Sequence, residues 1–194
     1  MKSSKRKGIT LTELLVASIL IGIVMVGVIA VSFAIKKMQE TTNKSALLAM
    51  RATAVITHMT KNVALAVGYQ DDPGIVVGER WVSIRQEQGE SGNFTDDLWV
   101  IYYYSAHNLY FCTQTVDEGG SVPDSGGNCP ESPSKLLSAN VLKAKFTLFN
   151  DPEQYQFYLA VELKTIYDSG QGEDLVNNPT FNVESRMSPA GHSW

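Results

Sequence analysis

An uninterrupted apolar segment near the N-terminus constrains the fold of this chain more than any other feature. From Leu14 to Ile35, 22 successive residues include no charged residue, Asn, Gln or Pro. A helix of that length measures about 33 Å, and the hydrocarbon core of a bilayer is about 30 Å thick. Four cations precede the segment, namely Lys2, Lys5, Arg6 and Lys7. This basic flank predicts a membrane-anchored chain whose N-terminus is cytoplasmic.

An ordinary secretory signal peptide explains this segment poorly. The apolar stretch is longer than the usual h-region of about 7–15 residues. The best small-residue cleavage site, at residues 30–32, lies inside the apolar stretch. Glu13 stands at the head of the stretch, where a carboxylate is costly in lipid and is therefore a functional candidate.

The sequence around Glu13 resembles the leader of type IV prepilins and pseudopilins. The matching residues are Lys7-Gly8-Ile9-Thr10-Leu11-Thr12-Glu13-Leu14-Leu15. In that family a prepilin peptidase cleaves after the Gly, on the cytoplasmic side, and N-methylates the new first residue. The resemblance implies cleavage between Gly8 and Ile9, N-methylation of Ile9 and an assembly role for Glu13, the fifth mature residue. The chain departs from the commonest pattern at two positions, with Ile9 in place of Phe and Thr12 in place of an aliphatic residue.

These assignments have a physical rationale. Gly8 has no side chain to prevent the backbone from lying flat in a protease cleft. The Glu13 carboxylate can pair with the N-terminal amine of a neighbouring subunit, so that two costly charges satisfy each other only on assembly. The alternative is a plain signal anchor that happens to contain a Gly and a Glu at these positions.

The helix is expected to continue beyond the membrane. Residues 36–67 contain no Pro and no Gly, and one face of that helix is apolar. That face is formed by Leu48, Ala52, Val55, Met59, Val63 and Val67. The sequence therefore predicts one helix over 9–67, with a transmembrane half (9–35) and an amphipathic half (36–67) that packs on a sheet. Gly68 is expected to end it.

The chain from Gly68 onward changes to the two-residue period of β-strands. The expected strands are Ile75–Arg85, Leu98–Ser105, Asn108–Val116, Leu142–Leu148, Phe157–Leu163 and Thr180–Arg186. The fourth and fifth should form an antiparallel hairpin. The predicted class is α+β and pilin-like, with a leader (1–8), the two helix halves and a periplasmic antiparallel β-sheet domain (68–194).

The two cysteines, Cys112 and Cys129, both lie in the part predicted to be exported. In an oxidising periplasm such a pair usually forms a disulfide, although two unconnected thiols are the alternative. In many major pilins the disulfide closes a loop near the C-terminus, whereas three predicted strands follow Cys129 here. By that comparison the chain looks more like a minor pilin or a minor pseudopilin.

No sequence pattern supports catalysis. His58, His107 and His192 are scattered and form no zinc motif, and no nucleophile elbow is present. The best metal candidate is the acidic stretch 168–174, in which Asp168, Glu173 and Asp174 could offer oxygens to calcium. Its spacing matches no defined calcium loop, so a solvated acidic turn is the simpler interpretation. We predict no cofactor and no enzymatic activity.

An aromatic cluster is expected on two adjacent strands. It consists of Tyr102, Tyr103, Tyr104, Tyr110 and Phe111. Alternation sends some of these rings into the core and others outward, where they could contact a subunit or a ligand.

The expected function is therefore assembly as a minor subunit of a type IV pilus or a type II secretion pseudopilus. The expected partners are prepilin peptidase, other pilin or pseudopilin subunits and the inner membrane. Removal of residues 1–8 leaves 12 basic against 20 acidic residues, a net charge of −8 that argues against a nucleic-acid partner. The chain should cross the inner membrane once, with a periplasmic domain, and then enter the filament. The alternative from another class is a signal-anchored periplasmic enzyme or ligand-binding module.

Overall fold

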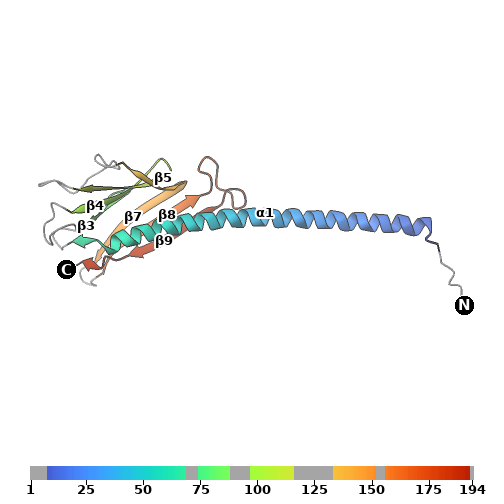
Figure 1. Ribbon diagram of the computed structural model, residues 1–194, viewed down its shortest axis with the longest axis horizontal. Coiled ribbons are helices and arrows are strands. Elements are labelled where there is room, and N and C mark those ends of the chain that lie inside the picture. The colour runs from blue at the N-terminus through green and yellow to red at the C-terminus, as the bar shows by residue number, and fades with distance from the viewer. Residues whose placement is uncertain (1–7, 69–73, 88–96, 116–132, 152–155, 193–194) are drawn as a thin grey trace. The chain divides into compact units, whose positions relative to one another are not determined.

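The computed structural model describes residues 8–68, 74–87, 97–115, 133–151 and 156–192. They form two compact units, residues 1–42 and 43–194, and the helix α1 (Leu11–Ala64) contributes to both (Figure 1). The strands are β1 (Val67–Gly68), β2 (Ile75–Val77), β3 (Trp81–Gln86), β4 (Leu98–Ser105), β5 (Asn108–Thr115), β6 (Lys135–Ala139), β7 (Val141–Asp151), β8 (Gln156–Ile166), β9 (Thr180–Met187) and β10 (Gly191–His192). The predicted α+β class is confirmed.

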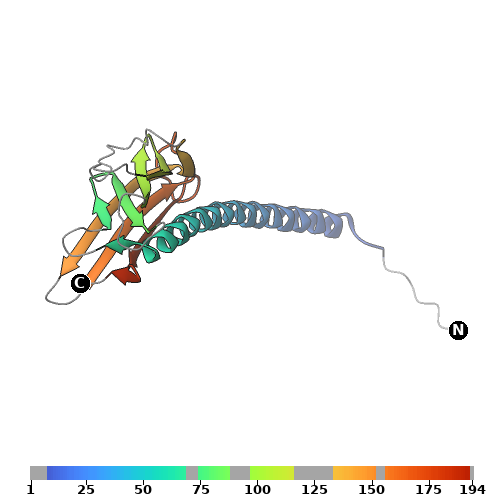
Figure 2. The same cartoon turned by 60° about the vertical axis from the view of Figure 1, so that its left-hand side comes forward.

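The strands of the second unit form two antiparallel sheets and one short parallel pair. The larger sheet has the order β2-β3-β4-β5-β6, the smaller one has the order β7-β8-β9, and β1 pairs with β10 (Figure 2). The predicted hairpin is confirmed, with Phe146 opposite Val161 on β7 and β8. The tight turn between β4 and β5 is confirmed as well, with Ala106 and His107 at φ angles of 46° and 62°.

The expectation of a single sheet was incomplete. Asn140 lies between the last strand of the larger sheet and the first strand of the smaller one, with a φ angle of 58°. Asn tolerates this left-handed conformation better than most residues, so it can redirect the chain from one sheet to the other. Alternation identifies strands but does not say which of them pair, and for that reason the sequence showed no division.

The predicted apolar face of α1 packs against both sheets. Its residues Leu48, Ala52, Val55, Met59 and Val63 are at most 1% exposed. Four of these, all but Leu48, share one core cluster with Val100 and Tyr102 of the larger sheet and with Leu159 and Leu163 of the smaller one. The helix thus closes a single core between the two sheets, as expected for an amphipathic helix in water.

The helix ends three residues earlier than predicted, at Ala64 rather than Val67. The Ala66 amide donates to the Val63 carbonyl over 3.0 Å, and Val67 then pairs with Gly191 in the parallel ladder. Strand pairing with a distant segment replaces the last helical turn, so Gly68 lies in a strand instead of capping the helix.

A short polar network joins α1 to the larger sheet. Asn62 Nδ2 donates to the Tyr102 hydroxyl oxygen over 2.6 Å, and the Tyr102 oxygen lies 2.9 Å from His58 Nδ1. Gln86 Nε2 on β3 donates to Asn62 Oδ1 over 2.8 Å. Because these directional contacts flank the apolar core, they favour one register of the helix on the sheet.

Candidate functional site: the N-terminal segment

The beginning of α1 is capped by the side chains of Thr10 and Glu13. The Thr10 backbone amide and the Thr10 hydroxyl both donate to Glu13 Oε2 over 2.9 Å. The Glu13 amide is in turn 3.4 Å from Thr10 Oγ1. This reciprocal pattern is a capping box, which satisfies amide groups that a helix leaves without partners in its first turn. The Thr-x-x-Glu spacing could have revealed it, but our sequence analysis considered only the charge of Glu13.

The predicted cleavage point lies in an exposed segment that precedes the helix. Gly8 and Ile9 are both exposed, and Ile9 reaches 76%. A Cβ added to Gly8 would meet no other atom within 4 Å. Among the described residues, packing therefore leaves room for a side chain at this position. Residues 1–7, which carry the predicted basic leader, lie outside the described residues.

The apolar segment is the one helical stretch among the described residues that is long and apolar enough to cross a membrane. Its large apolar side chains are all exposed, and none of its most apolar window is buried among the described residues. Its two hydroxyl groups donate to the helix backbone, Ser18 to the Leu15 carbonyl and Ser32 to the Val28 carbonyl, each over 2.8 Å. A helix with no polar group left over fits a lipid environment, where water cannot supply partners.

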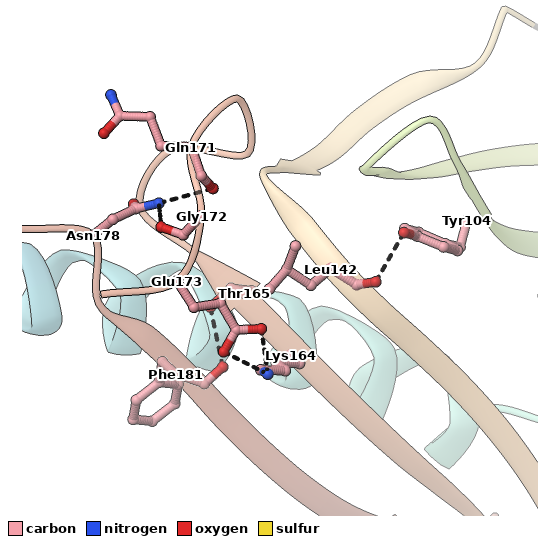
Figure 3. A network of polar contacts seen from close by, with 9 residues as sticks. All are labelled: Tyr104, Leu142, Lys164, Thr165, Gln171, Gly172, Glu173, Asn178 and Phe181. Atoms are coloured by element: carbon pink, nitrogen blue, oxygen red, sulfur yellow. Dashed lines mark hydrogen bonds and ion pairs between the residues drawn. The ribbon is translucent and has the colours of Figure 1, made fainter. Parts of the chain in front are cut away.

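The predicted acidic stretch is a compact loop whose carboxylates contact protein donors. Lys164 Nζ donates to both oxygens of Glu173 over 2.8 and 2.9 Å (Figure 3). Asp168 Oδ1 accepts from the Gly170 amide over 2.9 Å, and Asp174 Oδ1 accepts from the Val176 amide over 2.8 Å. Within the described part of the chain, no three His, Cys, Asp or Glu side chains are grouped as metal ligands would be. Calcium binding here stays the untested alternative to a solvated acidic turn.

The predicted disulfide involves one described residue and one that is not. Cys112 on β5 is 2% exposed, and its Sγ lies 3.9 Å from the Ile101 carbonyl oxygen. With Trp99 and Ile101 it forms a second buried cluster. Cys129 lies outside the described residues, so the Cys112–Cys129 bond stays a prediction.

The aromatic cluster divides between two faces of the larger sheet, as predicted. Tyr102 is fully buried against α1, and Tyr104 donates its hydroxyl to the Leu142 carbonyl over 3.0 Å (Figure 3). Tyr103 and Tyr110 stack with ring centroids 5.2 Å apart. The ring of Phe111 lies 4.7 Å from that of His58. These rings therefore contact one another or the core.

The outward face of the smaller sheet carries a groove of about 520 Å³. Its lining includes side chains of both charges, among them Lys145, Glu184 and Arg186. The aromatic side chains there already have partners, because Phe149 stacks on Tyr158 and Arg186 lies over the same Tyr158 ring.

One family model matches the chain, the prokaryotic N-terminal methylation motif, over residues 3–29. The match includes Gly8, Ile9, the capped start of α1 and more than half of the exposed apolar segment. No curated protein and no solved structure matches the chain.

Proposed function

We propose, on the premise that this chain is a type IV prepilin-like protein, that its mature form is a minor structural subunit of a type IV pilus or a type II secretion pseudopilus. One observation carries the proposal most strongly. The methylation motif at residues 3–29 coincides with the start of a long apolar helix whose most apolar window is unburied among the described residues. A membrane and then neighbouring subunits would cover its exposed side chains.

Maturation begins with removal of the leader. Prepilin peptidase cleaves between Gly8 and Ile9 and methylates the amine of Ile9. Gly8 and Ile9 are exposed, which leaves the bond between them accessible to the peptidase, and the open space around Gly8 supports a requirement imposed from outside the chain.

The mature chain waits in the inner membrane, with its N-terminus at the cytoplasmic side and its second unit in the periplasm. On assembly, the Glu13 carboxylate exchanges its contacts with Thr10 for the amine of a neighbouring subunit. The apolar helix meanwhile exchanges lipid for the helices of other subunits, since lipid tails are as apolar as aliphatic side chains.

A minor role is supported by the second unit. Strands β6 to β10 follow Cys129 in the sequence, whereas in many major pilins the disulfide closes a loop near the C-terminus. The net charge of −8 after processing gives no support to a nucleic-acid partner.

Mass spectrometry of the chain purified from its native host tests this function. We expect a product that begins at Ile9 and carries one methyl group. Gly8→Val should remain unprocessed, because the new side chain obstructs the cleft of the peptidase. Thr12→Val is the matched control and should be processed normally, since the family usually has an aliphatic residue there. An intact N-terminus, or one cut by signal peptidase, would instead favour a signal-anchored enzyme or binding module.

A further inference from the structure

The loop between β8 and β9 displays two aliphatic side chains to solvent. Leu175 is 86% exposed and Val176 is 41% exposed. No other large hydrophobic side chain among the described residues of the chain is as exposed as Leu175. Because single exposed leucines are common on protein surfaces, this pair is informative only if the surrounding structure holds it outward.

The exposure is built into the loop by hydrogen bonds. Asn178 is 2% exposed, and its Nδ2 donates to the carbonyl groups of Gln171 and Gly172 over 3.2 and 2.9 Å (Figure 3). The same Nδ2 donates to the Asp168 carbonyl over 2.9 Å. The Asp168 amide donates to Asn178 Oδ1 over 2.8 Å. The backbones of Asp174 and Asn178 exchange two hydrogen bonds of 3.0 Å across the loop tip, which comprises residues 174–178. The loop thus holds Leu175 outward in a defined conformation.

Lys44 ties this tip to the beginning of the second unit. Its Nζ donates to the Asn177 carbonyl over 2.7 Å and lies 4.8 Å from the centroid of the Tyr167 ring. Lys44 is the second residue of the unit that begins at Asn43. It follows Ile35, the last residue of the apolar segment, by nine positions, so covalent geometry alone keeps the two within about 30 Å. Through Lys44, the loop tip is therefore attached to the second unit at a point only nine residues after the apolar segment.

The chemistry of this surface matches a lipid interface. Aliphatic side chains insert at the boundary between headgroups and acyl chains, while Tyr and Lys favour the headgroup level. Leu175 and Val176 supply the first kind of group, and Tyr167 and Lys44 supply the second.

We propose that Leu175 and Val176 dock into the interface of the membrane that anchors the chain, while the subunit waits for assembly. This inference rests on the proposed membrane-anchored state. The driving force is apolar insertion, because the acidic side chains of the loop give it no attraction for anionic headgroups. The tip holds the second unit against the bilayer until neighbouring subunits replace the lipid.

Spin labels on the full-length chain in phosphatidylcholine nanodiscs, at one chain per disc, test the proposal. Leu175→Cys carries the label, and Leu136→Cys is the matched control, a 56% exposed leucine on β6. Collision rates with oxygen, which concentrates in lipid, and with a nickel chelate, which stays in water, report depth. The unsubstituted chain, treated in the same way, gives the background of the native cysteines.

We expect the ratio of oxygen to nickel collisions to be several-fold higher at position 175 than at position 136. The same ratio should persist when anionic lipid or salt is added. Equal ratios at the two positions, in chains that co-elute with the discs, would overturn the docking. If position 175 were shielded from the nickel chelate only in discs that hold several chains, the proposal would be overturned too, because a second subunit would then cover Leu175. Chains that elute apart from the discs would instead contradict the anchored state itself.

Discussion

At the scale of single residues, Glu13 has two different roles that must be separated. The carboxylate caps α1 through Thr10, and it is also the group proposed to receive the amine of a neighbouring subunit. Both roles follow from one side chain, so the loss of assembly in a Glu13→Ala variant would be ambiguous. A glutamine can still accept the capping hydrogen bonds but carries no charge.

We therefore predict that Glu13→Gln and Glu13→Ala both insert into the membrane but fail to enter filaments. Charge pairing is lost in both variants, whereas only the alanine variant also loses the cap. The measurement compares the amount of subunit in sheared filaments with the amount in membranes, with Thr12→Val as the control. Normal incorporation of Glu13→Gln would show that the cap, not the charge, is what assembly requires.

His58 is the described residue whose titration bears on the stability of the second unit. Partial burial and the nearby Lys61 cation lower the pKa of His58 below its usual 6.5. Burial raises the pKa of Tyr102, so that the phenol keeps its hydrogen. Since Asn62 already donates to the Tyr102 oxygen, that hydrogen is available to His58 Nδ1. The neutral imidazole is thus the form that the fold favours.

We predict that acid destabilises the second unit through His58. A depressed pKa means that the unfolded chain binds the proton more readily, so this stability is present above about pH 6.5 and is lost as the pH falls through the folded-state pKa. His58→Gln should flatten the decline. Thermal unfolding of the detergent-solubilised chain between mildly alkaline and mildly acidic pH measures the difference. If the unfolding temperature fell equally with pH in the unsubstituted chain and in His58→Gln, the loss of stability would belong to other groups.

At the scale of elements, the two halves of α1 differ in what surrounds them. The second half buries the apolar face that its spacing predicted, from Leu48 to Val63, while the apolar side chains of the first half are exposed. Helical period and a run of apolar residues are local signals, and for that reason both halves could be read from the sequence. The end of the helix could not be read from the sequence, because pairing with the distant strand β10 replaces its last turn.

The second half of α1 carries two methionines that test this packing. Met59 is fully buried and Met50 is 70% exposed on the same helix. We predict that Met59→Ala lowers the free energy of unfolding by about 2–5 kcal/mol, since it leaves a cavity between the sheets. Met50→Ala should change it by less than about 0.5 kcal/mol. Urea unfolding of the full chain in detergent checks both values, and a similar cost at the two positions would contradict the observed core.

At the scale of the whole molecule, the sequence revealed the fold class and the proposed N-terminal site more readily than the rest. The site at Gly8, Ile9 and Glu13 is contiguous, so a short motif suffices to find it. The tip at Leu175 depends on Asn178 and on Lys44, more than a hundred positions earlier, and no local pattern encodes such contacts. The division into two sheets was missed for the same reason.

The pairing of β1 with β10 has a consequence for the order in which the second unit folds. Val67 lies beside Gly191, and the Ala190 amide donates to the Ala64 carbonyl over 3.3 Å. Contacts between such distant segments form late, since the intervening chain must first be brought into place. We therefore expect the ladder that closes the helix terminus to form only after the rest of the second unit has brought β1 and β10 together.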